Sequence, residues 1–127
     1  MRYLLDTHTA LWALDDDFKL SEKARGIINN VSIELFVSLA SVWEMAIKIS
    51  IGKLVFAGGI AAFLERLKEN GIKIIEIKEG HLRIVETLPF IHRDPFDRLL
   101  IASVNYEGLT IITNDDNIQK YNVKWIW

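Results

Sequence analysis

The sequence predicts an α/β fold, a three-layer α/β/α sandwich with a mostly parallel sheet, formed by one domain over residues 1–127. Short apolar runs, typical of buried strands, alternate along the chain with amphipathic stretches of helical period. Half of the residues are hydrophobic and a quarter are charged, a composition that can fill one sizeable core. These two observations favour a single globular α/β domain.

The N-terminal half begins with a strand and alternates with helices. Strands are expected at 2–5 and 34–37, where apolar residues run into polar ones. Helices are expected at 9–14, 22–29, 38–51 and 60–70. Ser21 is a typical N-cap for the second of these helices, and Gly52 and Gly71 are expected to end the third and the fourth.

The C-terminal half continues the alternation. Strands are expected at 72–77, 109–113 and 123–127, and helices at 78–88, 95–106 and 117–120. Pro89 ends the first of these helices, and Leu82 and Val85 are expected to be its inward-facing residues. Asp94 followed by Pro95 is typical of an N-cap and a first helical position, so it marks the start of the next helix.

The composition excludes several classes of function. There is no cysteine, which excludes disulfides, thiolate zinc sites and cysteine nucleophiles. The formal net charge of −2 lacks the broad basic footprint of a domain that binds DNA nonspecifically. No apolar run approaches the length of a membrane span and no signal-peptide pattern is present, so we expect a soluble, cytoplasmic protein without a membrane partner.

Acidic residues follow two expected strands and begin two expected helices. Asp6 follows the first strand and Asp115 the fourth, while Glu44 and Asp97 lie near the starts of helices. In a parallel sandwich all four can meet at the carboxyl edge of the sheet, where such folds bind ligands. Two carboxylates at about 4 Å repel by roughly 4 kcal/mol at an effective dielectric constant near 20. Gathering four therefore predicts a site for Mg²⁺ or Mn²⁺, which prefer oxygen ligands.

Each acid also has a simpler interpretation. Glu44 fits a capping box with the serine three residues before it, and Asp97 could offset the dipole of its helix. Asp115 could be a turn residue. Asp6 and Asp116 could be the N-caps of the helices that follow them.

Four segments in order carry recognisable motifs. They read LLDTHTALW at 4–12, SLASVWEMAIK with GKL at 38–54, HRDPFDRLLIA at 92–102 and TND at 113–115. Together they resemble the motifs of the PIN-domain ribonucleases, specifically the toxins of VapC type found in prokaryotic toxin–antitoxin pairs. The resemblance covers essentially the whole chain.

The resemblance implies the strand order 3-2-1-4-5 and a divalent metal site. The residues that take the places of the family's acidic quartet, as metal ligands and catalytic residues, are Asp6, Glu44, Asp97 and Asp115. The neighbouring residues expected to assist, as further acids or as hydroxyls that orient a carboxylate or a water, are Thr7, Asp94, Thr113 and Asp116. No member of the quartet is missing.

The activity implied is hydrolysis of RNA phosphodiesters by an endoribonuclease that depends on Mg²⁺ or Mn²⁺. Arg98 and Lys48 could contact the substrate phosphate or pair with the acids, and the spacing of Lys48 from Glu44 favours pairing. His8 and His92 are expected to orient neighbouring groups or to be structural.

The partner implied is a cognate antitoxin, whose helix would pack in a groove formed by 43–51 and 60–67 and whose basic side chain would enter the acidic pocket. A homodimer is also typical of the family. His81 is expected to lie on the surface, and the four tryptophans are expected to be mostly core. The alternative interpretation is a PIN-like protein that binds an antitoxin-like partner without catalysis.

Overall fold

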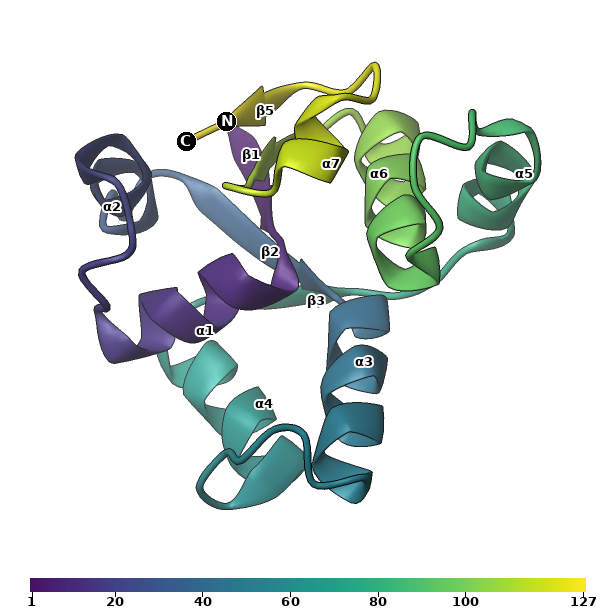
Figure 1. The fold of residues 1–127 in the computed structure, drawn as a ribbon. Coiled ribbons are helices and arrows are strands. Elements are labelled where there is room, and N and C mark those ends of the chain that lie inside the picture. Colours follow the sequence, from purple (N-terminus) through teal and green to yellow (C-terminus); the bar gives the residue numbers. More distant parts are fainter.

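The computed structural model describes residues 1–127 and contains one five-stranded sheet in which every pair of neighbouring strands is parallel (Figure 1). The strands are β1 (Arg2–Leu5), β2 (Glu34–Ser38), β3 (Lys73–Ile75), β4 (Thr110–Ile112) and β5 (Trp125–Ile126). Their order across the sheet is β3-β2-β1-β4-β5. The predicted α/β class and the predicted strand order are both confirmed.

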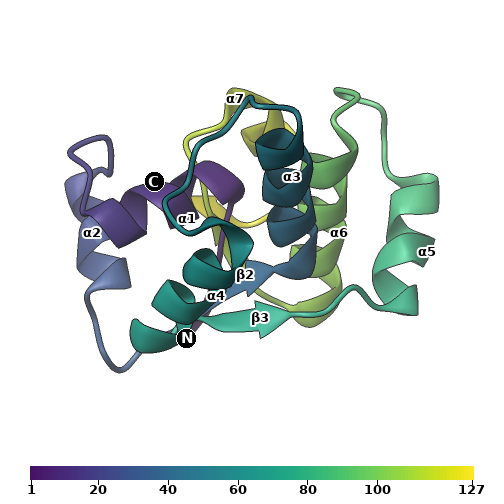
Figure 2. The same ribbon diagram turned by 90° about the horizontal axis from the view of Figure 1, so that it is seen from below.

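Seven helices connect the strands. They are α1 (Thr7–Asp15), α2 (Glu22–Ile28), α3 (Leu39–Ser50), α4 (Gly59–Glu69), α5 (Glu79–Thr87), α6 (Pro95–Glu107) and α7 (Asp116–Gln119). Figures 1 and 2 show α1, α3 and α4 grouped on one side, while α5 and α6 lie together on the other. No helix combines the length and the apolar character that a membrane crossing needs.

The sheet separates two hydrophobic cores, because successive side chains of a strand point to opposite faces. On β1, Tyr3 and Leu5 pack into the core beneath α1 to α4. Leu4 between them packs into the core that α6 and α7 cover. Leu4 pairs with Phe36 on β2 and Ile111 on β4, so β1 is the buried central strand that places Asp6 between its neighbours.

Three expected strands are shorter in the structure, and the one expected at 109–113 covers Thr110–Ile112. The strand expected at 72–77 covers only Lys73–Ile75, and the one expected at 123–127 covers only Trp125–Ile126. Both lie at sheet edges, where a strand has one hydrogen-bonding neighbour instead of two. Ile77 leaves the sheet and packs against the second core instead.

Some exposures also differ from expectation. Leu82 is 53% exposed, so its expected inward position is wrong, whereas Val85 does pack against the second core. Trp43 and Trp125 are exposed rather than buried, while Trp12 and Trp127 pack against the first core. The surface position of Trp43 on α3 matters for the function proposed below.

Candidate active site

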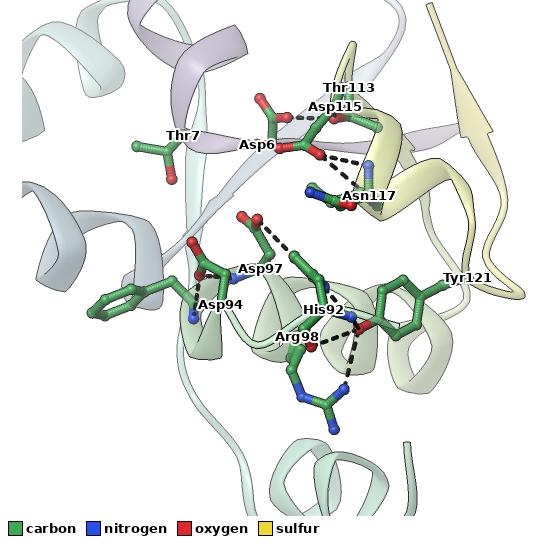
Figure 3. Close-up of polar contacts among 12 residues, drawn as sticks. Asp6, Thr7, His92, Asp94, Asp97, Arg98, Thr113, Asp115, Asn117 and Tyr121 are labelled. Carbon is green, nitrogen blue, oxygen red and sulfur yellow. Dashed lines mark hydrogen bonds and ion pairs between the residues drawn. The ribbon is translucent and has the colours of Figure 1, made fainter. Parts of the chain in front are cut away.

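Helix starts converge on the carboxyl edge of the sheet. The helices α1, α3 and α7 begin within four residues of the ends of β1, β2 and β4. Asp6, Asp94 and Asp115 are the N-caps of α1, α6 and α7. Backbone N–H groups and helix dipoles at these starts stabilise negative charge. Figure 3 shows side chains of these three segments around one region of the molecule.

Asp6 is held at the end of β1 by two hydrogen bonds. One carboxylate oxygen accepts from the backbone N–H of Thr9 at 2.8 Å, and the other accepts from the hydroxyl of Thr113. The simpler interpretation of Asp6 as an N-cap is therefore confirmed, and the cap starts α1 at Thr7, two residues before the expected start. Burial raises the pKa of Asp6 despite these hydrogen bonds.

Glu44 lies in the second turn of α3 and is buried. Its Oε1 accepts from the hydroxyl of Thr7 at 2.8 Å, and its Oε2 accepts from Lys48 Nζ at 2.9 Å. The expected pairing with Lys48 is confirmed. The capping-box interpretation of Glu44 is wrong, because Ser38 is the N-cap of α3 and Ser41 is its third residue.

Asp97, in the first turn of α6, is also in a perturbed environment. Its Oδ2 lies 3.1 Å from Nε2 of His92. Burial raises its pKa to about 7; the hydrogen bond from His92 opposes this rise, and the charges of Asp94, Asp115 and Glu44 add to it. The mutual influence of these carboxylates places them in one electrostatic cluster.

A hydrogen-bond network links Asp97 and Arg98 of α6, through His92, to Tyr121 in the C-terminal segment. The Tyr121 hydroxyl accepts from the backbone N–H of His92 at 3.2 Å and from Arg98 at 3.1 Å, and it lies 2.8 Å from His92 Nδ1. The ionised Asp97 carboxylate can only accept, so His92 Nε2–H donates to it, while the Tyr121 hydroxyl can donate to His92 Nδ1 or to the His92 carbonyl oxygen at 3.3 Å. Sequence reasoning missed this network because Tyr121 lies 23 residues from Arg98 and 29 from His92.

Arg98 does not take either position that the sequence suggested. Its guanidinium is buried and donates to the backbone carbonyls of Leu88 and Pro89, at 3.0 and 2.7 Å, as well as to Tyr121. These partners hold the segment before α6 against the helix. The expectation that Arg98 contacts phosphate or pairs with the acids is thus replaced by a structural role.

The other acids cap helices. Asp94 accepts from the N–H groups of Phe96 and Asp97, both at 2.9 Å. Asp115 accepts from the N–H of Asn117 at 2.8 Å. The expected capping role of Asp116 is wrong, since Asp116 is the exposed first residue of α7.

His81 is fully buried, so its expected surface position is wrong. Its Nδ1 accepts from the backbone N–H of Lys78, which leaves Nε2–H to donate to Glu107 at 2.8 Å. This contact holds the pKa of Glu107 below its usual value. The pair joins α5 to α6, and only the 26-residue separation hid it from local pattern analysis.

A small cavity opens at the strand ends. It has a volume of about 120 Å³ and is lined by Asp6, His8, Trp12, Asn114 and Asp115. The donor set suits Mg²⁺ or Mn²⁺, because the expected ligands are carboxylates and the chain has no cysteine. No three acidic or histidine side chains stand together as a ready-made metal group. Repulsion among the carboxylates opposes their closer approach, and a divalent cation would remove it.

The chain is similar to a known protein family and to solved structures over nearly its whole length. The PIN domain family model matches residues 3–124. No curated protein sequence matches the chain significantly. The solved structure of VapBC2 from Rickettsia felis, bound to a promoter DNA fragment, has a TM-score of 0.70 at 15% identity and covers 100% of this chain and 99% of that chain.

Two further solved structures share the fold. DNA-bound VapBC from Salmonella typhimurium has a TM-score of 0.72 at 14% identity, over 99% of this chain and 97% of that chain. A toxin–antitoxin complex from Klebsiella pneumoniae has a TM-score of 0.63 at 16% identity, over 98% of this chain and 96% of that chain. At these identities the likeness concerns the fold.

Proposed function

The chain belongs to the PIN domain family, and from that premise we propose that it is an endoribonuclease that hydrolyses RNA phosphodiesters with Mg²⁺ or Mn²⁺. One observation carries the proposal, the acidic cluster in which burial and neighbouring carboxylates raise the pKa of Asp97 to about 7. Carboxylates crowded at the ligand-binding edge of a parallel sheet need a cation or a proton to offset their repulsion.

In this proposal Asp6, Glu44, Asp97 and Asp115 would hold the metal. A divalent ion bound there would polarise the phosphate and lower the pKa of a bound water. The protein's own part is to keep the ligands in place. The hydroxyl of Thr113 holds Asp6, that of Thr7 holds Glu44, and the Nε2–H of His92 holds one oxygen of Asp97. Such partners fix the direction of a ligand and raise its affinity for metal.

The surrounding charges suit a phosphate substrate once a cation is present. Lys48 pairs with Glu44 and is partly exposed, so it can turn to a phosphate oxygen when Glu44 binds metal. Asp94 and Asp116 add negative charge near the N-termini of α6 and α7, which strengthens the attraction for the cation.

We also propose that the chain is the toxin of a toxin–antitoxin pair and that it acts in the cytoplasm, with a homodimer as its assembly. A helix of the antitoxin would pack along α3 and α4, where large apolar side chains are exposed. They are Trp43 and Ile47 on α3, Leu64 on α4, and Ile51 and Val55 on the segment between the two helices. Exposed large apolar side chains are typical of a surface that binds an amphipathic helix. The fold shared with a toxin–antitoxin complex supports this partner class.

The test of the enzyme proposal is cleavage of purified RNA. The wild-type protein should cleave in Mn²⁺, EDTA should stop it, and Asp97→Asn should lose the activity. Glu65→Gln, which removes an exposed acid on α4, is the matched control and should cleave like the wild type. Equal cleavage by the wild type and Asp97→Asn would identify the activity as a contaminant.

The second candidate is an interaction protein without catalysis. It is favoured by the exposed apolar side chains on α3, on α4 and between them, together with the lack of a ready-made group of three metal-binding side chains. This candidate predicts that the chain binds an amphipathic helix but binds no Mn²⁺ and leaves RNA intact. Isothermal titration with Mn²⁺ separates the two candidates without relying on activity.

A further inference from the structure

The segment that follows β4 carries one of the proposed metal ligands at its start and a buried tyrosine at its end. Asp115 caps α7, and Tyr121 follows shortly after the helix ends at Gln119. The Tyr121 side chain is 4% exposed and packs in the second core, while its hydroxyl lies against His92 and Arg98 (Figure 3). The Gln119 amide donates to a backbone carbonyl at the end of β4 at 3.0 Å. Tyr121 is therefore held in a fixed place relative to Asp115.

Four polar groups surround the Tyr121 hydroxyl, and two of them donate to it. The backbone N–H of His92 and the guanidinium of Arg98 donate at 3.2 and 3.1 Å. The hydroxyl proton then has two acceptors within reach, the Nδ1 of His92 at 2.8 Å and the carbonyl oxygen of His92 at 3.3 Å. Nδ1 is the closer acceptor, and a proton on Nδ1 would bring a third donor to an oxygen that already accepts twice. The geometry thus favours donation from the hydroxyl to Nδ1.

Donation to Nδ1 determines which proton the neutral His92 imidazole carries. With Nδ1 as the acceptor, the proton of the ring lies on Nε2, 3.1 Å from Oδ2 of Asp97. The rings of His92 and Tyr121 also pack edge-on, with centroids 5.4 Å apart and planes at 67°. The tyrosine therefore sets both the tautomer and the direction of the imidazole. A hydrogen-bonded partner of this kind orients a ligand carboxylate and raises its affinity for metal.

We propose that Tyr121 is a positioning residue of the metal site, because its hydroxyl sets the Nε2–H tautomer of His92 and thereby the direction of the Asp97 carboxylate. We call these contacts the Tyr121–His92–Asp97 relay. The role rests on the proposed metal-dependent function, since it requires that Asp97 is a ligand. Because Tyr121 ends the segment that Asp115 begins, the relay also keeps the carboxylates of α6 and α7 in a fixed relation. Tyr121 itself contacts neither metal nor RNA.

The first test measures Mn²⁺ binding without RNA, by titration calorimetry at pH 7.5. Tyr121→Phe deletes the hydroxyl and keeps the packed ring, so we expect Mn²⁺ binding to weaken by about 10- to 100-fold, the usual effect of losing such a partner. Tyr106→Phe deletes the hydroxyl of an exposed tyrosine on the helix that carries Asp97 and should bind like the wild type. Glu107→Gln breaks the pair with His81 outside the site. It should also keep wild-type affinity, which separates the relay from a general loss of stability.

A double variant tests whether Tyr121 acts through His92. His92→Phe should weaken Mn²⁺ binding at least as much as Tyr121→Phe, and combining the two should change the affinity by less than about twofold, because the relay is already broken. Arg98 keeps its two backbone carbonyl partners in all of these variants. Wild-type affinity of Tyr121→Phe, additive losses in the double variant, or an equal loss in Glu107→Gln would each overturn the proposal.

A second measurement, on the wild type in EDTA, does not depend on how Tyr121→Phe folds. Nitrogen-15 NMR of the histidine side chains at pH 7.5 reports which imidazole nitrogen carries the proton, and the His92 signal is the one that His92→Phe lacks. We expect Nε2–H in the wild type and a mixture of tautomers in Tyr121→Phe. A wild-type His92 protonated at Nδ1 alone would overturn the relay. If the wild type binds Mn²⁺ and Tyr121→Phe binds it equally well, only the positioning role fails. If the wild type binds no Mn²⁺, the metal-dependent function fails and the positioning role fails with it.

Discussion

Substitution of Asp97 by Asn should stabilise the protein while it removes metal binding. The carboxylate is destabilised where it stands, because burial and three neighbouring acids raise its pKa from 3.8 to about 7. A rise of roughly 3 units corresponds to about 4 kcal/mol at 1.36 kcal/mol per unit. The side chain is 17% exposed, so solvent screens only part of this penalty. Asn keeps the shape but accepts a weaker hydrogen bond from His92, so we expect a net gain of about 1–3 kcal/mol at pH 8.

The pH dependence follows from the direction of the shift. A carboxyl group whose pKa is raised on folding binds its proton more tightly in the folded state, so its contribution to stability is fully present below pH 3.8 and is lost as the pH rises to about 7. Asp97→Asn has no such group. The two proteins should therefore be similarly stable near pH 4, and the variant should become the more stable one between pH 4 and 7.

The assay is urea unfolding in EDTA at pH 4.5, 6 and 8, followed by circular dichroism. With a slope of about 2 kcal/mol per molar urea, a gain of 2 kcal/mol moves the midpoint by about 1 M. Glu65→Gln on α4 is the control and should follow the wild type at each pH. Parallel curves for Asp97→Asn and the wild type, or a less stable variant at pH 8, would refute the crowding of Asp97.

Other perturbations test separate parts of the structure. Glu107→Gln should destabilise the protein by about 1–2 kcal/mol at pH 7, because His81 loses its charged hydrogen-bond acceptor. The difference in the free energy of unfolding from the wild type should shrink as the pH falls below 4.5, because the pKa of Glu107 is lowered on folding and protonation removes the contribution of its carboxylate. Gly80→Ala should gain less than the roughly 1 kcal/mol expected for Ala over Gly in a helix, because its Cβ would lie 2.2 Å from the exposed Tyr106 ring, which must move. Tyr106→Ser in the same chain should restore most of that gain in thermal unfolding. Trp43→Ser, at a side chain 55% exposed, should destabilise the protein by about 0.5–1.5 kcal/mol, because it removes the edge-on contact with the Phe96 ring at 5.0 Å. It should also weaken binding of an amphipathic antitoxin helix at least tenfold in titration calorimetry.

Local signals explain why the central strand and the helix starts were predictable. The apolar run before Asp6 is buried on both faces of the sheet, and the cap at Asp94 is written in the sequence as aspartate followed by proline. The parallel topology then brings the strand ends and the following helix starts to one edge. The position of the four acids near that edge follows from this logic, whereas their role as metal ligands remains a prediction.

Contacts between distant segments explain what was missed. Nothing near Arg98 in the sequence indicates that it donates to Tyr121, 23 residues away, rather than to an acid. The burial of His81 likewise depends on Glu107 in the next helix. The shortened β3 lies at an edge of the sheet, a position that the apolar pattern of the segment does not contain.

The most direct measurement for the metal site is anomalous scattering from a crystal of the wild-type protein soaked in Mn²⁺. We expect a peak bounded by carboxylate oxygens of Asp6, Glu44, Asp97 and Asp115, with those side chains drawn closer together than in the present structure. A well-ordered crystal at saturating Mn²⁺ that shows these carboxylates without a peak between them would contradict the metal-dependent mechanism.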